Sequence, residues 1–286
     1  MTDHKPIFAG IQGDHNQYQN SEILLQSIPY DGTSTWRKGA DKGFKAFLDA
    51  SENMEIYDIE TDSEVYQKGV HILDPILEDS SPEVMFEAVY QNTKKLLKTD
   101  KFLTFFGGEH SISIGIIKAF YEAHPEITIL QLDAHTDLRP EFHGSAYNHA
   151  CAVHDASKNA NLVQVGIRSM DSSELPYLDR RKCYFAEDMY GKTDWVEDSL
   201  SKITGKVYIT LDLDVFDPSI MPSTGTPEPG GLQWNTMIQY LRKVFEQKNV
   251  LGFDIVELAP IEGLQGPDFL AAKLYYKMLS YKFANS

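Results

Sequence analysis

Six short runs of apolar, largely β-branched residues recur along the chain and constrain its fold more than any other feature. They are ILLQSIP (23–29), FLTFF (102–106), ITILQL (127–132), LVQVGI (162–167), KVYITL (206–211) and VLGFDI (250–255). Each run is nearly continuous in apolar residues instead of alternating, which is typical of strands buried on both faces. We therefore expect a sheet that is covered by other elements on both sides.

Helical periodicity lies between these runs. Apolar residues recur on one helix face within residues 83–98, 237–245 and 270–278. Strands that alternate with helices indicate βαβ units and a mostly parallel sheet in the α/β class. The Pro- and Gly-rich cluster at 223–231 is too short to divide domains, so we expect one domain over residues 1–286.

The charge balance disfavours two classes of partner. The chain has 42 Asp and Glu against 26 Lys and Arg, a formal net charge of −16. Nucleic acids and anionic membranes need a positive surface, so neither is expected, whereas a small cationic ligand is compatible. Two cysteines without a CxxC pair, and a polar N-terminus without an apolar leader, predict a cytoplasmic protein.

Polar motifs follow four of the apolar runs directly. GGEHS follows 102–106, DAHTD follows 127–132, DLDVFD follows 206–211 and VELAP follows 250–255. Ligands of parallel sheets bind beyond the carboxyl ends of the strands, so we expect these motifs to meet in one site. The candidate residues that they supply are His110, Asp133, His135, Asp137, Asp212, Asp214 and Glu257.

Two imidazoles and four aspartates at three strand ends favour a metal site. Uncompensated carboxylates in a dry pocket are too costly, and two divalent cations would balance four of them. An oxygen-rich ligand set with some imidazole suits Mn²⁺ better than Zn²⁺, which favours thiolates. Each motif alone could be a loop histidine or a turn-capping aspartate, but together they predict two Mn²⁺ ions.

These motifs, together with YNHACAV, STGTPEPGG and the stretch at 28–51, resemble the ureohydrolase family, which includes arginases and agmatinases. The resemblance covers roughly residues 23–280. It implies a three-layer α/β/α fold around an eight-stranded sheet, and hydrolysis of a guanidino compound to an amine and urea by a metal-bridging hydroxide. It also implies a homotrimer or homohexamer, with residues 1–20 as a lid or an interface segment.

The resemblance also implies a role for each site residue. His110 and Asp137 would bind one manganese, His135 and Asp214 the other, and Asp133 and Asp212 both. Asp137 would also hydrogen-bond the hydroxide. Glu257 would orient the guanidinium, His149 would carry protons, and Thr226 would lie near the substrate.

Several neighbouring residues need a choice. His149 is flanked by His143 and His154, and its position in YNHACAV favours it as the proton carrier. Cys151 has no dedicated base and is interpreted as a packing residue. Glu109 departs from the aspartate or asparagine of many members, and the pair His154-Asp155 departs from the basic residues of agmatinase-like relatives.

The loop that follows DAHTD, LRPEFHGSAYNHA, resembles agmatinase-type loops more than arginase loops. Agmatine, which would give putrescine and urea, is therefore the favoured substrate. Guanidinobutyrate, arginine, formimidoylglutamate and guanidine remain alternatives within the family. A non-catalytic metal-binding protein and a two-metal phosphoesterase are alternatives outside it. The phosphoesterase would need basic residues near the metals, where the ligand motifs offer only Arg139.

Overall fold

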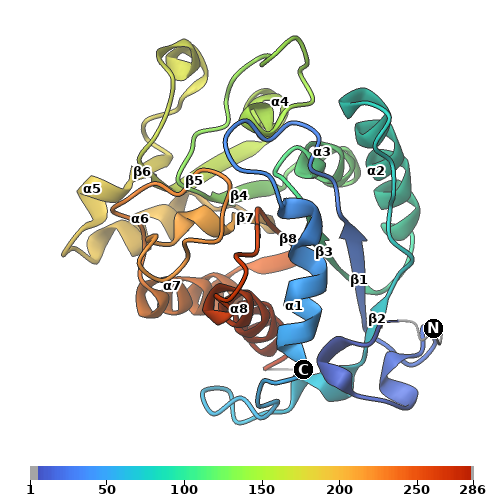
Figure 1. Cartoon of the computed structure of the whole chain (residues 1–286). Coiled ribbons are helices and arrows are strands. Elements are labelled where there is room, and N and C mark those ends of the chain that lie inside the picture. The colour runs from blue at the N-terminus through green and yellow to red at the C-terminus, as the bar shows by residue number, and fades with distance from the viewer. Residues whose placement is uncertain (1–5, 285–286) are drawn as a thin grey trace.

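The apolar runs form strands of one eight-stranded sheet in the computed structural model, which describes residues 6–284 (Figure 1). The strands are β1 (Ile23–Ile28), β2 (Val70–Ile72), β3 (Phe102–Gly107), β4 (Thr128–Leu132), β5 (Asn161–Ile167), β6 (Cys183–Phe185), β7 (Lys206–Asp212) and β8 (Asn249–Val256). Their order is β2-β1-β3-β8-β7-β4-β5-β6, and every neighbouring pair is parallel. The prediction of an α/β fold on a parallel sheet is confirmed.

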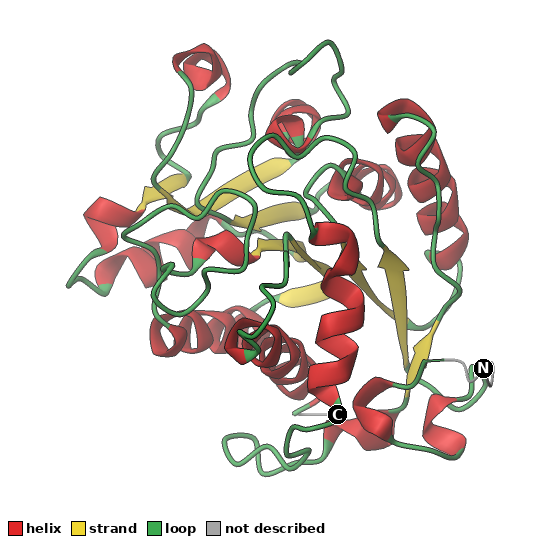
Figure 2. Cartoon of the chain, in the orientation of Figure 1, coloured by secondary structure: helices red, strands yellow, loops and turns green. Residues whose placement is uncertain are grey.

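Helices cover both faces of this sheet (Figure 2). They are α1 (Gly43–Ser51), α2 (Pro82–Leu96), α3 (Ile112–Ala123), α4 (His154–Asn159), α5 (Ala186–Met189), α6 (Asp194–Lys202), α7 (Trp234–Gln247) and α8 (Gly266–Phe283). The first face packs against α2, α3 and α4, and the second against α1, α6, α7 and α8. The sheet therefore lies between two layers of helices, in the three-layer α/β/α arrangement that the resemblance implied.

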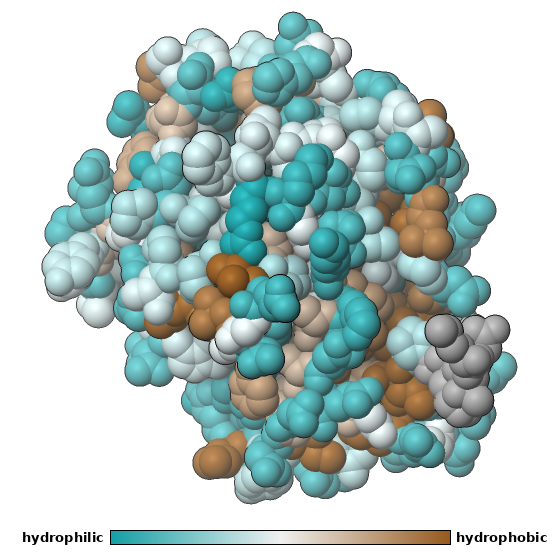
Figure 3. Space-filling model, in the orientation of Figure 1, coloured by the Kyte–Doolittle hydropathy of each residue, from teal (hydrophilic) through white to brown (hydrophobic). Residues whose placement is uncertain are grey.

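Side-chain alternation along the strands builds the two cores. In β3, Phe102 and Phe106 join the cluster of α1 and α8, whereas Leu103 and Phe105 join the cluster of α2 and α3. All four are buried, which explains why the run reads as continuously apolar. No described helix has the length and apolarity that a bilayer span requires, and the face in Figure 3 is mostly hydrophilic, with hydrophobic residues in small separate groups.

The two edge strands were not among the apolar runs. β2 and β6 each have three residues, VHI and CYF, and their edge positions need no second neighbouring strand. A three-residue segment carries too little periodicity to be distinguished from a loop. Only the family resemblance implied eight strands, and that expectation is confirmed.

Part of the N-terminal segment packs against the second face. Phe8 is buried, and its ring lies 5.8 Å from that of Phe47 in α1 and 5.1 Å from that of Tyr275 in α8. The backbone N–H of Ala9 donates to Ser51 at the end of α1 (3.0 Å). None of residues 6–20 lines the cavity described below. A role for the segment in a subunit interface stays a prediction.

The sheet order brings the motifs together. β3, β8, β7 and β4 are four consecutive strands in the middle of the sheet, and each is followed by one of the polar motifs. Because the strands are parallel, their carboxyl ends share one edge of the sheet. Segments that are more than 100 residues apart in the sequence therefore meet at this edge.

Candidate functional site

Close backbone approaches at the strand ends bring His110 and Glu257 side by side. A Cβ atom on Gly108 would lie 1.8 Å from the carbonyl oxygen of Tyr30, so only glycine fits between β3 and the 30–37 loop. The N–H of Glu257 donates to the carbonyl of Gly108 (2.8 Å), and Glu257 Oε1 accepts from the N–H of His110 (2.9 Å). Glu257 adopts a left-handed φ of 69°, a strained conformation that aims its side chain at this edge.

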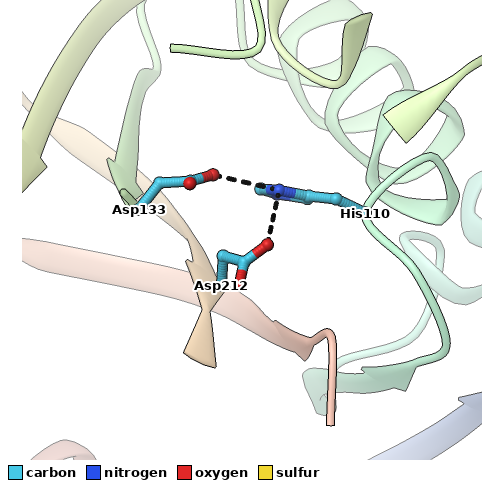
Figure 4. Close-up of side chains that lie close together, drawn as sticks. All are labelled: His110, Asp133 and Asp212. Carbon is cyan, nitrogen blue, oxygen red and sulfur yellow. Dashed lines mark ion pairs between the residues drawn. The ribbon is translucent and has the colours of Figure 1, made fainter. Parts of the chain in front are cut away.

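His110 faces three carboxylates. Its Nδ1 atom lies 3.1 Å from Asp133 Oδ2, 3.1 Å from Asp137 Oδ2 and 3.3 Å from Asp212 Oδ2. Figure 4 shows the ring between Asp133 and Asp212. All four side chains are buried, yet Nδ1 has no hydrogen-bond partner among the described residues. A buried nitrogen left in this state, amid convergent carboxylate oxygens, fits a cation ligand.

A second group of ligand atoms adjoins the first. His135 Nδ1 lies 2.9 Å from Asp214 Oδ2 and 3.7 Å from Asp133 Oδ1. The two sets that could hold an ion are His110 with Asp133 and Asp212, and Asp133 with His135 and Asp214. They share Asp133, whose two oxygens face the two histidines. This geometry supports the predicted bridging role of Asp133, whereas Asp212 faces only the first group and Asp137 lies beside it.

The charge distribution also fits bound cations. Burial and then the charge of Asp133 raise the pKa of Asp137 to about 7. Burial, followed by the neighbouring Asp214 and Asp133, raises the pKa of Asp212 well above its usual range. Burial and mutual repulsion destabilise the ionised forms of these carboxylates, and a bound cation would offset both effects.

The orientation of His110 is set by a chain of polar contacts from β7 and β8. His110 Nε2 lies 2.8 Å from Thr210 Oγ1, and the Thr210 hydroxyl donates to Asp254 Oδ1 (2.8 Å). Tyr208 donates to the other Asp254 oxygen (2.7 Å). Because the Thr210 hydrogen points to Asp254, Thr210 accepts from an Nε2–H group on His110, which leaves Nδ1 as the atom with a free lone pair.

His149 lines the same cavity from the loop after the DAHTD motif. Its Nδ1 atom lies 3.0 Å from Thr33 Oγ1, and its backbone N–H donates to the same oxygen (3.0 Å). Burial, with the charges of His135 and His110, lowers the pKa of His149 to about 4, so the ring is neutral near pH 7. His143 and His154 do not line this cavity.

The cavity has a volume of about 240 Å³ and includes residues that the sequence motifs did not identify. Thr226 lines it, and its role near the substrate stays a prediction. The unanticipated lining residues are Thr35, Phe142, Ala150, Ser169, Met170, Asp171 and Glu174. Most of them belong to loops whose paths depend on the packed fold. Thr35, Phe142 and Ala150 lay in quoted stretches, but those stretches had been used for the resemblance alone.

The departures from the family pattern lie outside the cavity. Glu109 is fully buried and accepts hydrogen bonds from Ser111 and from the Thr33 N–H, not from the His110 ring. His154 contacts the carbonyl of Leu138 and Lys158 through its two ring nitrogens. Both residues therefore have structural roles in this fold.

Cys151 and Arg139 bear on two alternative interpretations, a cysteine nucleophile and a phosphoesterase. Cys151 is buried, and burial, followed by the charge of Asp137, raises the pKa of its thiol to about 12, which opposes a role as a nucleophile. Arg139 lines the cavity, but its guanidinium stacks on Phe142 (4.3 Å) and lies 3.6 Å from Asp171. A phosphate ester would have to compete with that carboxylate, which makes the phosphoesterase interpretation less suitable.

Comparisons with known proteins agree with this geometry. A sequence profile of the arginase family matches residues 21–280. The N(1)-aminopropylagmatine ureohydrolase of Synechocystis sp. is 33% identical over 275 residues, covering 92% of this chain and 90% of the relative. The agmatinase of Halalkalibacterium halodurans is 30% identical over 251 residues, covering 86% of each. The solved structure of an agmatine ureohydrolase from Thermoplasma volcanium is 28% identical and covers 99% of this chain and 96% of its own, with a TM-score of 0.87.

Proposed function

Because this chain belongs to the arginase family, we propose that it is a ureohydrolase that acts on agmatine or on agmatine extended by an aminopropyl group. The observation that carries the proposal is the convergence of two metal-ligand groups, sharing Asp133, beside the buried carboxylate of Glu257. Metal ligands alone would suit many hydrolases. A buried carboxylate next to them supplies the partner that a guanidinium needs.

The described residues fit a pair of Mn²⁺ ions. His110, Asp133, Asp137 and Asp212 would hold one ion, and His135, Asp214 and the shared Asp133 the other. A second bridging role for Asp212 rests on the resemblance alone. When bound, such a pair lowers the pKa of a coordinated water so that it becomes a nucleophile near neutral pH. The mixture of carboxylates and two imidazoles, without a thiolate, supports manganese over zinc.

Glu257 binds and orients the substrate. Burial and the charge of Glu109 raise the pKa of Glu257 well above its usual range, so its ionised form is disfavoured unless a cation pairs with it. A guanidinium cation stabilises the ionised carboxylate by pairing with it through two parallel hydrogen bonds. The pairing also fixes the plane of the guanidinium and leaves its carbon open to attack by water.

His149 and Asp137 move the protons. Asp137 accepts a hydrogen bond from the attacking water and holds it toward the guanidinium carbon. His149 is neutral near pH 7, so its free ring nitrogen takes up the proton that the water releases as its oxygen attacks the guanidinium carbon. The same proton then passes to the amine nitrogen as the C–N bond breaks. Without that proton the amine would have to leave as an anion, which is too basic a leaving group at neutral pH.

The cavity lining supports a substrate with further positive charge. It contains six carboxylates, of Asp137, Asp171, Glu174, Asp212, Asp214 and Glu257, against the single guanidinium of Arg139. Two divalent ions would balance Asp137, Asp212 and Asp214 together with Asp133, which lies behind the lining, and Arg139 lies beside Asp171. Glu174 then remains besides the Glu257 that pairs with the guanidinium. Agmatine carries an ammonium group besides its guanidinium, and the aminopropyl derivative carries a second amine. The names of the relatives from Synechocystis sp. and Thermus thermophilus favour the extended substrate as a second candidate.

The test is urea release by the Mn²⁺-loaded protein from a panel of agmatine, N(1)-aminopropylagmatine, arginine, guanidinobutyrate and guanidine. We expect kcat/KM to be highest for one of the first two. A preference for arginine or guanidinobutyrate would keep the ureohydrolase assignment and contradict the proposed substrate. The absence of urea from the whole panel, with manganese bound, would contradict the function itself.

From the resemblance we also propose that three or six copies of the chain associate. Light scattering coupled to size-exclusion chromatography would then give a mass of three or six times 32.4 kDa. A monomer at micromolar concentration would contradict this proposal and leave the assignment of the site intact.

A further inference from the structure

The 30–37 loop belongs to a stretch of sequence that the proposed mechanism does not use. We propose that Thr33 in this loop is a positioning residue, which holds the imidazole of His149 in the orientation that proton transfer requires. The inference rests on the proposed function, because it concerns the proton carrier of that reaction. It differs from it in naming a residue that does not line the cavity.

Thr33 contacts His149 at two points. The Thr33 hydroxyl oxygen lies 3.0 Å from the ring Nδ1 and also accepts a hydrogen bond from the His149 N–H (3.0 Å). One contact fixes the ring and the other fixes the backbone from which the ring extends. The two residues are 116 positions apart in the sequence, so the contact joins two separate loops.

The chemistry of a hydroxyl suits a histidine that changes its protonation state. A hydroxyl donates to Nδ1 when the ring is neutral and Nε2 carries the hydrogen, and accepts from Nδ1–H when the ring is cationic or in its other tautomer. The contact therefore persists while a proton arrives at or leaves Nε2. A carboxylate in this position would only accept, and would favour the cation.

The loop that carries Thr33 is itself anchored on both sides. The Thr33 N–H lies 3.3 Å from Glu109 Oε1, and the Glu109 carboxylate is fixed in turn by Ser111. Further along, Arg37 donates to the carbonyls of Ala259 (2.9 Å) and Pro260 (3.1 Å), just beyond Glu257. The loop is thus anchored to the same strand ends that carry His110 and Glu257, and Thr33 in turn fixes the position of His149 relative to them.

This arrangement explains why a glutamate, and not a shorter aspartate, suits position 109. Its two oxygens reach Ser111, within its own loop, and the Thr33 backbone in another loop. An aspartate is one methylene shorter and could not keep both contacts without a backbone shift. The sequence departure at Glu109 and the contact between Thr33 and His149 are therefore parts of one arrangement.

The test compares Thr33→Val, which removes the hydroxyl at nearly constant shape, with Thr33→Ser, which keeps it. We expect Thr33→Val to lower kcat about 10-fold or more, with a smaller change in KM, since general acid–base catalysis contributes roughly 10²–10⁴-fold. Thr33→Ser should recover most of this loss. Ser34→Ala is the matched control in the same loop, because the Ser34 hydroxyl makes no hydrogen bond to another residue within 6–284.

A double-mutant cycle with His149→Ala separates positioning from a general loosening of the loop. If Thr33 acts through His149, adding Thr33→Val to His149→Ala causes no further loss of kcat. Additive losses would overturn the inference, as would a Thr33→Val enzyme with the kcat of the wild type. Wild-type protein that releases no urea from the panel would instead contradict the proposed function.

A spectroscopic measurement tests the contact without turnover. In metal-free protein labelled with 15N-histidine, the His149 ring signals are assigned by their loss in His149→Ala. We expect Thr33→Val to move the Nδ1 signal and Ser34→Ala to leave it in place. An unmoved signal in Thr33→Val would overturn the inference, whatever the activity of the enzyme.

Discussion

Asp133 is the carboxylate that links the two candidate metal groups. Its Oδ2 atom faces His110, while its Oδ1 atom faces His135 and accepts the N–H of that residue (2.6 Å). Burial opposes the charged form, but the neighbouring imidazoles of His110 and His135 outweigh it and hold the pKa of Asp133 below its usual range. This carboxylate is therefore the one that stays ionised and available to both candidate metal groups.

We predict that Asp133→Ala removes both ions and abolishes urea release, because each group loses the ligand that they share. Metal content per subunit, measured by mass spectrometry of the dialysed protein, should fall from about two toward zero. Asp171→Asn is the matched control, since Asp171 lines the cavity but belongs to neither metal group. A full metal content in Asp133→Ala would refute the bridging assignment.

At the scale of elements, the pairing of β7 with β8 orients the candidate ligand His110, which follows β3. Thr210 and Tyr208 on β7 both donate to Asp254 on β8, and Thr210 then contacts the ring of His110 after β3. The register of the sheet pairs Thr210 directly with Asp254. The His110 tautomer is thus determined by strand pairing.

We predict that Thr210→Val weakens manganese binding about 10- to 100-fold, as loss of a partner that orients a metal ligand typically does. Thr210→Ser keeps the hydroxyl and should bind nearly as tightly as the wild type. Competition with a chelator measures the affinities, and the melting temperature of the metal-free variants reports on folding. Equal affinities for the Val and Ser variants would mean that the contact does not orient His110.

The elements also differ in how well the sequence predicts them. The six long strands are buried on both faces, so their apolar runs match the observed bounds within one residue at each end. β2 and β6 lie at the edges with three residues each and leave no comparable signal. Helix α8 is buried on nearly all sides, so the predicted stripe at 270–278 covers only part of its 18 residues.

At the scale of the whole molecule, the candidate metal ligands could be predicted from the sequence, whereas most of the remaining residues of the site could not. His110, the aspartates and Glu257 follow strand ends directly, so the rule for parallel sheets predicts that they meet. Thr33, Phe142 and Asp171 approach the cavity on loops, where position depends on contacts such as that of Thr33 with Glu109. Such contacts between distant segments have no periodic signal in one sequence.

The fold brings several carboxylates together in a buried cluster, where they retain protons at higher pH than exposed carboxylates do. Because these protons must leave before a cation binds, metal binding depends on pH. In the metal-free protein the pKa of Asp137 is raised to about 7, first by burial and then by the charge of Asp133. Asp137 must lose its proton to bind a cation. Below pH 7 the bound proton competes with the metal, and above pH 7 it no longer does.

We therefore predict that manganese affinity rises from pH 6 to pH 8, by up to about tenfold per pH unit for each proton released on binding. Calorimetry at each pH, in buffers of different ionisation enthalpy, measures both the affinity and the number of protons released. A stability measurement alone would be less informative. Between pH 4 and 6.5 the lowered pKa of His149 makes stability rise with pH, while the raised pKa of Asp137 makes it fall. An affinity that stays constant from pH 6 to pH 8, with no proton release, would show that Asp137 is already ionised without metal or does not bind it.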